Sequence, residues 1–510
     1  MSPIIFLAIL LLILTLLWST FFPRADQKGS KNSGGKLPPG PRPLPIIGNL
    51  HQLTSLPHRG LQSLAKKYGP IMSLRLGQVP AVVVSSPEAA ELFLKTYDTV
   101  FASRPRVQAS EYMSYGSKGM AFSEYGPYWR NVRKLCILQL LSASKIESFA
   151  AMRRSEVGEL VKSLRRSAAA REVVDVSRKV GELIADIAFV MILGVDMEDK
   201  YHLKELVHVG LCLTGNFNLA DYVPFLAPLD LQGYTRRMKK VGKDLDKVLE
   251  KIIMEHEQRA REQQGRYDHK DFVDVLLSLM NQPMNPQDQH IYIIDRTNIK
   301  AIVLDMVVAA FDTSAAAIEW TLSELLKNPR VMKNLQEELE RVIGMDRLVE
   351  EKDLEKLDYL DMVVKESFRL HPVAPLLVPR ESIEDVTIEG HFIAKKSRII
   401  VNTWTIGRDP NVWSENVEEF YPERFIDNNV VDLRGHDFRL LPFGSGRRGC
   451  PGISLGLVNT RFVLAQLVHC FSWELPSGVE TKDLDMTEMF GLSMGRANHL
   501  LAKPTYRLLD

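Results

Sequence analysis

A glycine-rich loop, FGSGRRGCPG at 443–452, carries the residue with the most distinctive chemistry of this chain, Cys450. Three glycines before the cysteine and a Pro-Gly pair just after it predict backbone that turns tightly. An apolar run at helical spacing follows over 453–467, which places Cys450 just ahead of a predicted helix. The unpaired N–H groups at a helix N-terminus favour the thiolate, which is the form that binds metal. A single thiolate on a rigid loop suits the axial position of a haem iron and does not suit a zinc site.

The loop also fits a longer pattern, FxxGxRxCxG. Its five fixed positions hold Phe443, Gly446, Arg448, Cys450 and Gly452, whereas a structural cysteine in a glycine-rich turn, the simpler interpretation, requires none of them. On this motif the chain resembles the cytochrome P-450 family of haem-thiolate monooxygenases, and its PFGSGRRxCPG form resembles the plant microsomal A-type branch. The resemblance implies haem b (iron protoporphyrin IX) with Cys450 as its axial ligand, Phe443, Arg448 and Gly452 around the cofactor, and O2 as co-substrate.

The family fold implied by this resemblance is mainly α with small β-sheets (α+β). The stretches 71–76 and 81–84, separated by Gly77 and Pro80, predict a hairpin in a small sheet. Residues 101–122 lack a clean period and predict a long irregular loop, which by resemblance covers the distal face of the haem. We therefore expect a largely helical body with the remaining chemistry placed on its helices.

Trp129 and Arg133 lie four residues apart on a helix predicted over 128–141, so both side chains can point the same way. Alone, such a pair is ordinarily one core residue and one surface residue. In the family, a WxxxR pair meets a haem propionate, where the guanidinium forks onto the carboxylate. By position, Arg380 and Arg448 resemble two further propionate-binding arginines.

A long helix is predicted over 288–327, long enough to cross the core. Asp312 and Thr313 stand in its middle, where packing alone would prefer leucine. A threonine there can simply bond to the carbonyl four residues back. The family pattern (A/G)Gx(D/E)T(T/S) implies a catalytic role, in which Thr313 and Asp312 relay protons during oxygen activation. The chain departs from that pattern in carrying Ala310 where the family has glycine.

An ExxR pair, Glu366 and Arg369, falls on another predicted helix. The same string recurs at Glu338 and Arg341, which shows that ExxR alone is weak. The first pair lies among apolar residues, where an unpaired charge would be costly. By resemblance, Arg424 of a PERF segment completes a buried structural network with it.

The resemblance also implies a substrate pocket with a mainly apolar lining, built from the loop at 101–122, the long helix and two later segments. Such a lining predicts a lipophilic small molecule as substrate. The residues assigned to this pocket are Met113, Tyr115, Met120, Phe122, Ala309, Val373, Leu377, Phe490 and Leu492.

The N-terminus predicts a membrane anchor. Residues 3–22 carry no charge and are long enough to span a bilayer, while basic residues follow them, so we expect one span with the bulk of the chain in the cytosol. A cleaved signal peptide would need a basic start and a small-residue cleavage site. We expect a basic, proline-rich hinge over 23–45, a catalytic domain over 46–510, and localisation at the endoplasmic reticulum membrane.

Composition excludes several partners and cofactors. The 64 Lys and Arg balance 63 Asp and Glu, which argues against a nucleic-acid partner. The four cysteines are scattered without CxxC spacing, which argues against a disulfide framework. No GxGxxG fingerprint for binding a flavin or a dinucleotide occurs in the sequence. Electrons from NADPH must therefore arrive through a separate flavoprotein reductase.

Three functions stay open at this point. The first is a monooxygenase that hydroxylates a lipophilic molecule, such as a phenolic or terpenoid plant metabolite. The second is a haem-thiolate enzyme that catalyses a rearrangement or dehydration without external electrons. The third is a haem-binding sensor without turnover, which would need no proton relay.

Overall fold

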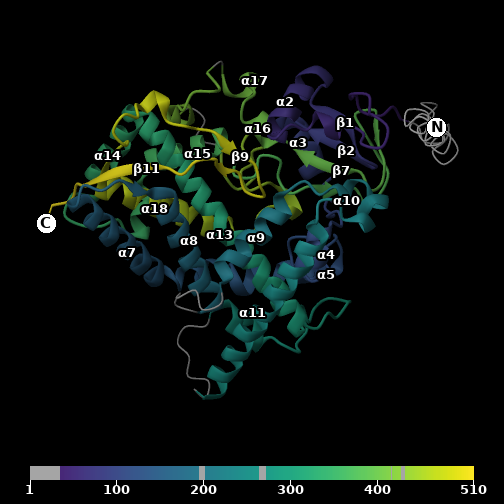
Figure 1. The fold of residues 1–510 in the computed structure, drawn as a ribbon, viewed down its shortest axis with the longest axis horizontal. Helices are drawn as coiled ribbons and strands as arrows, with labels where there is room; N and C mark the ends of the chain where they lie inside the picture. Colours follow the sequence, from purple (N-terminus) through teal and green to yellow (C-terminus); the bar gives the residue numbers. More distant parts are fainter. Residues whose placement is uncertain (1–34, 195–201, 263–270, 415, 427–430, 510) are drawn as a thin grey trace, which may run out of the picture.

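The computed structural model describes residues 35–194, 202–262, 271–414, 416–426 and 431–509, and helices dominate them (Figure 1). This confirms the predicted mainly α fold with small β-sheets. The longer helices are α7 (Ala150–Ala169), α8 (Val176–Leu193), α9 (Leu203–Gly215), α11 (Tyr234–Glu262), α13 (Arg296–Lys327), α14 (Pro329–Ile343), α15 (Asp358–Leu370) and α18 (Ile453–Cys470). The shorter ones are α2 (Pro57–Tyr68), α3 (Pro87–Glu91), α4 (Gln108–Met113), α5 (Pro127–Leu135), α6 (Ala143–Glu147), α10 (Leu219–Tyr222), α12 (Phe272–Ser278), α16 (Thr403–Ile406) and α17 (Pro410–Trp413).

The helix α13 runs through the middle of the molecule and packs against α8, α15 and α18 (Figure 1). It begins at Arg296, eight residues later than predicted, because Asp295 caps it and accepts the N–H of Asn298 at 2.7 Å. The residues just before it form turns instead of helix: the Met284 N–H donates to the Tyr292 carbonyl at 2.8 Å. The helix ends at Lys327, as the sequence predicted.

The predicted hairpin is present as β1 (Ile71–Leu76) and β2 (Val79–Val84), paired antiparallel. It belongs to a four-stranded sheet completed by β7 (Arg398–Val401) and β4 (Arg380–Glu381), which carries Arg380 towards the cysteine loop. The other strands form small sheets: β3 (Val174–Asp175) with β11 (Leu501–Tyr506) and β8 (Phe471–Glu474), β5 (Val386–Ile388) with β6 (His391–Ile393), and β9 (Glu488–Met489) with β10 (Gly495–Arg496).

The proline-rich segment that precedes this sheet lies on the body of the protein. Ser73 of β1 donates its backbone N–H to the Pro39 carbonyl at 2.8 Å and its hydroxyl to the Pro38 carbonyl at 2.7 Å. The predicted anchor at 3–22 and the first part of the predicted hinge, 23–34, lie outside the described residues.

Two helices among the described residues, α13 and α18, are long and apolar enough to cross a membrane. In each, 67% of the apolar window is buried inside the protein. This burial is that of core helices packed against other helices.

Candidate functional site

The loop at 443–452 is shaped by two glycines in the left-handed region, Gly444 at φ +66° and Gly446 at φ +67°. A Cβ at Gly446 would lie 2.2 Å from the Leu94 carbonyl oxygen, so no other residue fits there. The Cys450 N–H donates to the Phe443 carbonyl at 2.9 Å, which closes the loop just before α18 begins. These constraints hold Cys450 at the entrance of α18, as the sequence predicted.

The Cys450 side chain is half-buried. Burial raises the pKa of its thiol, while the Gly452 N–H and the Arg133 guanidinium pull that pKa down. A metal ion bound at the sulfur would deprotonate it outright. Phe443, the first residue of the loop, lies edge-on to Phe368 with ring centroids 5.6 Å apart and beside Gly456 of α18.

The helix α5 brings Trp129 and Arg133 to this loop, so the predicted WxxxR pair shares one face. The Arg133 guanidinium donates to the Gly449 carbonyl at 2.8 Å and lies 5.6 Å from the Trp129 ring centre. The α-helix ends at Leu135, and a π-helical turn over Cys136–Leu140 follows it directly. The sequence predicted one continuous helix to residue 141. A π-turn widens the backbone and often accompanies a functional site.

Four arginines gather around the loop: Arg104, Arg133, Arg380 and Arg448. Burial lowers the pKa of Arg104 and lowers that of Arg448 to about 9. Repulsion from the neighbouring arginines lowers both pKa values further in the same direction. Among the described residues, Asp98 is the carboxylate that bonds to this group, and it accepts from Arg380 at 2.7 Å.

This surplus of buried positive charge is costly without an anion. A ligand with two carboxylates would neutralise it, and haem carries two propionates. A thiolate donor and an excess of arginines beside it therefore fit haem.

The four arginines differ in how far their donors are occupied. Arg448 donates through all three nitrogens to the carbonyls of Ala102, Met120 and Ser123, and its guanidinium lies 4.0 Å from the Trp129 ring centre. Much of its hydrogen-bonding capacity thus fixes the protein chain.

Arg104 is the member that the sequence reasoning missed. It donates to the Ala121, Val378 and Pro379 carbonyls through Nε and Nη1. Among the described residues, Nη2 has no hydrogen-bond partner and is available to a ligand. No periodicity marks Arg104 in the sequence, because it stands in an extended Ser-Arg-Pro segment.

The loop at 114–126 has no regular structure, yet side chains hold its backbone in place. Trp129 Nε1 donates to the Met120 carbonyl at 3.1 Å, and the Tyr128 hydroxyl donates to the Lys118 carbonyl. From α13, Asp305 accepts the N–H groups of Met120 and Ala121. The prediction of an irregular loop over 101–122 is therefore partly wrong, because this stretch contains α4. Hydrogen bonds fix the part of the loop that follows α4.

Asp305 could have been suspected from the sequence, because an acid within the apolar run IVLDMVV needs a partner if it is buried. It is 8% exposed. Burial raises the pKa of its carboxyl to about 6, against the opposing effect of the two N–H donors.

The turn in the middle of α13 is exposed, although the helix segments before and after it are buried. Residues 298–307 and 314–326 are almost entirely buried, whereas Ala309 and Thr313 are exposed and lie one turn apart on the same face. An accessible space therefore lies beside this turn of the core helix. The Thr313 hydroxyl donates to the Ala309 carbonyl at 2.8 Å, which is the bond to the carbonyl four residues back that the sequence allows. Ala310 is half-buried, and the helix continues unbroken through it.

Asp312 points elsewhere. The Ser493 hydroxyl, in the connection between β9 and β10, donates to Asp312 Oδ2 at 2.5 Å. The structure thus places the two residues of the predicted proton relay in different surroundings.

Four predicted pocket residues lie on α4, in the loop at 114–126 or beside the cysteine loop. Met120 and Phe122 belong to the bonded loop, and Met113 is buried at the end of α4. Leu377 adopts φ +50° and lies against the cysteine loop, since a Cβ at Gly444 would be 3.6 Å from its Cδ1.

Other predicted pocket residues are held by known partners. The buried Val373 accepts the Met494 N–H at 2.8 Å through its carbonyl. Phe490 stacks on His58 of α2, with ring centroids 5.9 Å apart, and Leu492 packs at the end of α9. Tyr115 has its hydroxyl 3.0 Å from Asp246 of α11, so its polar end faces that helix.

The ExxR network is assembled in full. Arg369 makes two hydrogen bonds of 2.8 Å to the Glu366 carboxylate, and Arg424 adds a third of 2.8 Å. Glu366 and Arg369 are 0% and 1% exposed. The other ExxR string behaves differently: Glu338 accepts the N–H groups that begin α15, and Arg341 is exposed.

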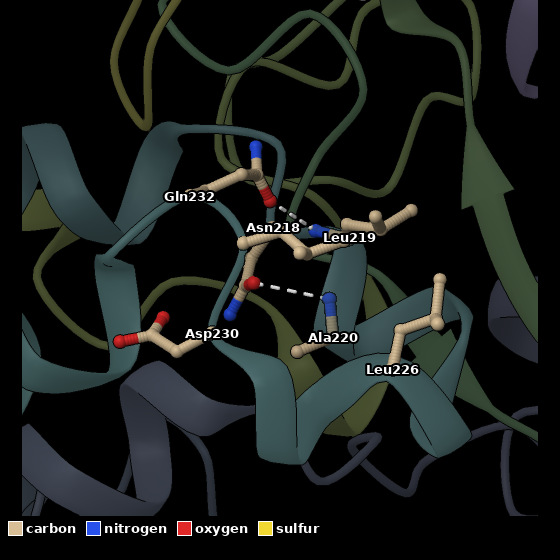
Figure 2. Close-up of a pocket in the computed structure, with 7 residues that line it drawn as sticks. Asn218, Leu219, Ala220, Leu226, Asp230 and Gln232 are labelled. Atoms are coloured by element: carbon tan, nitrogen blue, oxygen red, sulfur yellow. Dashed lines mark hydrogen bonds between the residues drawn. The ribbon is translucent and has the colours of Figure 1, made fainter.

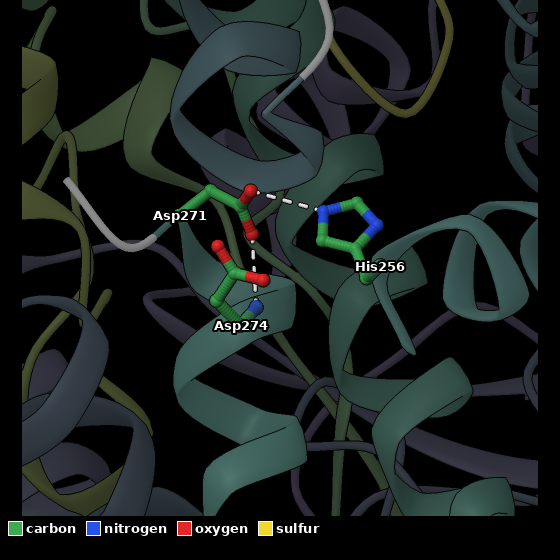
Figure 3. Close-up of side chains that lie close together, drawn as sticks. All are labelled: His256, Asp271 and Asp274. Carbon is green, nitrogen blue, oxygen red and sulfur yellow. Dashed lines mark hydrogen bonds and ion pairs between the residues drawn. The ribbon is translucent and has the colours of Figure 1, made fainter. Parts of the chain in front are cut away.

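A second polar cluster joins α11 to α12 (Figure 3). His256 Nε2 lies 2.9 Å from Asp271 Oδ2, Asp271 accepts the Asp274 N–H at 2.9 Å, and possible ligand atoms of the three lie within 4.8 Å of one another. The Arg259 guanidinium is 2.9 Å from the same His256 nitrogen, so a cation already stands beside the cluster. We interpret it as a clamp between the two helices.

A small surface hollow lies between α10 and the following turn (Figure 2). Its polar groups satisfy one another: Gln232 accepts the Leu219 N–H at 2.7 Å, and Asn218 accepts the Ala220 N–H at 3.1 Å. It contains none of the predicted site residues.

Comparison with known proteins agrees with this geometry. A family model described as Cytochrome P450 matches residues 38–501. Cytochrome P450 CYP736A12 of Panax ginseng is 60% identical over 473 residues, which cover 93% of this chain and 94% of the relative. Cytochrome P450 750A1 of Pinus taeda is 43% identical over 489 residues, covering 93% and 92%. Desmethyl-deoxy-podophyllotoxin synthase of Sinopodophyllum hexandrum is 41% identical over 484 residues, covering 94% of each.

The family-model match covers most of the chain and spans the cysteine loop, the arginines around it and the open turn of α13. These comparisons confirm the predicted family and, with it, an oxidoreductase of the monooxygenase class that uses haem iron and O2. The chain is a plant cytochrome P450 and belongs to the cytochrome P450 family.

Proposed function

We propose that this monooxygenase hydroxylates a lipophilic small molecule in the accessible space beside Ala309 and Thr313. The proposal rests on the exposed turn in the middle of α13, a core helix whose segments before and after this turn are buried. Ala309 and Thr313 are exposed on one face of this otherwise buried helix, so a small molecule can reach the core helix at this turn.

The haem would be held by Cys450 at the iron and by arginines at the propionates. Arg133, Arg380 and Arg104 each retain a donor nitrogen without a partner among the described residues. Arg448 and Trp129 would support them by fixing the loop at 114–126. When bound, the haem supplies the oxidising chemistry, activating dioxygen with two electrons and two protons.

The proton-handling groups of the chain would be Thr313 and Asp312. The Thr313 side chain is exposed to the accessible space, and its hydroxyl keeps one hydrogen bond to the Ala309 carbonyl. A hydroxyl in this position can accept a proton from one neighbour and donate its own to another. Asp312 would supply the acidic partner on the adjoining face of the helix.

The substrate would be orientated mainly by shape. Phe122, Leu377 and Leu492 are half-buried apolar side chains that would contact the substrate, whereas Met113 and Met120 are buried. The small side chain of Ala309 keeps its face of the helix free of bulk. A relative at 41% identity is named a desmethyl-deoxy-podophyllotoxin synthase. We therefore place the substrate among plant specialised metabolites, such as phenolics or terpenoids.

Electrons would come from NADPH through a flavoprotein reductase. The exposed Arg130 and Lys134 of α5 and the half-exposed Arg447 could meet an acidic partner on the side of the cysteine loop. An anchor over residues 3–22 would keep the enzyme at the endoplasmic reticulum membrane with the catalytic domain in the cytosol.

A reconstitution tests the proposal. The haem-loaded protein is mixed with lipophilic plant metabolites, NADPH and a plant reductase under isotopically labelled dioxygen. We expect one labelled oxygen atom in the product and no product without the reductase. Product formed without the reductase would show a rearranging enzyme instead, and binding without any product across the screen would favour a sensor.

A further inference from the structure

We propose that Ser493 is a positioning residue for Asp312, which rests on the proton-handling role proposed for Asp312. Ser493 Oγ donates to Asp312 Oδ2 at 2.5 Å, across a separation of 181 residues. Among the described residues, Ser493 is the hydrogen-bond partner of the Asp312 side chain. The orientation of this carboxylate is therefore set by a hydroxyl from the β9–β10 connection.

Helix geometry separates the directions of the two side chains. Consecutive residues of an α-helix point about 100° apart, so Asp312 and Thr313 cannot both face the same direction. Thr313 faces the accessible space, whereas Asp312 is half-buried against the β9–β10 connection. The hydrogen bond from Ser493 holds the Asp312 carboxylate in one orientation, on the helix face that adjoins the face of Thr313.

The Ser493 bond is not needed to hold the β9–β10 connection itself. Trp320 Nε1 donates to the Met494 carbonyl at 3.0 Å, and the Met494 N–H donates to the Val373 carbonyl at 2.8 Å. The Arg496 guanidinium also donates to the Ser323 hydroxyl. Since these three contacts fasten the segment to α13 and its surroundings, losing the Ser493 hydroxyl should act on Asp312 and leave the fold in place.

The same connection carries two predicted pocket residues, Phe490 and Leu492. It packs so closely on the end of α9 that a Cβ at Gly215 would lie 2.5 Å from the Leu492 nitrogen. Ser493 thus links the orientation of the acid to the segment that would contact the substrate.

The test compares four variants in the haem-loaded protein with its reductase and a substrate that turns over. Ser493→Ala removes the donor, Ser493→Thr keeps it, and Ser323→Ala loosens the same segment through Arg496 without touching Asp312. Asp312→Asn reports the role of the acid itself. The first readout is the fraction of NADPH electrons that reach product, together with the solvent isotope effect on turnover.

We expect Ser493→Ala to lower this fraction about threefold to tenfold and to raise the solvent isotope effect, with Ser493→Thr and Ser323→Ala close to wild type. A loss in Ser323→Ala equal to that in Ser493→Ala would overturn the inference, because the role would then be structural. If Asp312→Asn uncouples turnover but Ser493→Ala does not, this inference alone fails. If Asp312→Asn has no effect, the proposed role of Asp312 fails as well.

A second readout needs no turnover. In the resting protein, the carboxylate infrared band of Asp312 is identified as the band lost in Asp312→Asn. We expect Ser493→Ala to shift this band and Ser493→Thr to restore it. An unshifted band in Ser493→Ala would show that the hydroxyl does not bind the carboxylate, and would overturn the proposal.

Discussion

Asp305 of the core helix α13 lies with its Oδ2 atom 2.5 Å from the backbone nitrogen of Met120. The same oxygen accepts the Ala121 N–H at 2.9 Å. One buried carboxylate therefore ties the loop that carries predicted pocket residues to the helix that carries Thr313. The shape of this loop is set by bonds to the core.

The raised pKa of Asp305 predicts that the stability of the protein depends on pH. Burial raises its pKa from 3.8 to about 6, so the folded protein binds more protons at this group than the unfolded chain between those values. Its favourable contribution to the free energy of unfolding is complete below pH 3.8 and is lost as the pH rises through 6, a change of about 3 kcal/mol. Urea unfolding of wild type and Asp305→Asn from pH 4 to 7 should show wild type losing stability relative to the variant. Parallel curves would contradict this assignment.

Arg104 should matter for haem retention. Arg104→Ala removes a buried guanidinium whose Nη2 has no partner among the described residues, so we expect the haem content of the purified protein to fall about tenfold. The matched control is Arg106→Ala, two residues on, because Arg106 is exposed and pairs with Glu124 on the surface. Haem content equal in the two variants would show that Arg104 serves the protein chain alone.

Thr313→Ala should retain haem but divert electrons from product to hydrogen peroxide. Its hydroxyl faces the accessible space, whereas the hydroxyl of the neighbouring Ser314 is buried. We expect Thr313→Ala to lower the coupling of NADPH use to product about tenfold or more and Ser314→Ala to change it little. Unchanged coupling in Thr313→Ala would remove the threonine from proton delivery.

The two ExxR strings should differ sharply on mutation. Arg369→Ala leaves the carboxylate of Glu366 buried with one fewer partner, which we expect to cost more than about 3 kcal/mol of stability. Arg341→Ala removes an exposed arginine and should be nearly neutral. Thermal unfolding of both variants tests this contrast. Similar destabilisation would mean that the buried network is not what distinguishes the strings.

Local features of the sequence predicted much of the fold and part of the site. The cysteine loop could be read because its glycines, arginine and cysteine lie within ten residues, and the hairpin at β1 and β2 because its strands are adjacent. The end of α13 was marked by Asn328-Pro329. Its start at Arg296 was missed although Asp295 and Asn298 form a capping box that the sequence displays.

The contacts that were not predicted join distant segments. Asp305 meets Met120 across 185 residues and Ser493 meets Asp312 across 181, so no spacing within the chain reveals either bond. The family resemblance assigns Tyr115 to the pocket lining, and in the structure its hydroxyl bonds to Asp246 of α11. Which end of an amphipathic side chain faces a cavity depends on packing and not on residue type.

We expect the Cys450 thiolate to hold the haem iron, and the spectrum of the reduced carbon monoxide complex tests this role most directly. The matched control is Cys470→Ala, since Cys470 is buried at the end of α18 and contacts Gln466. We predict the thiolate-type Soret band in wild type and in Cys470→Ala, and its absence in Cys450→Ala. An unaltered band in Cys450→Ala would show that another side chain binds the iron.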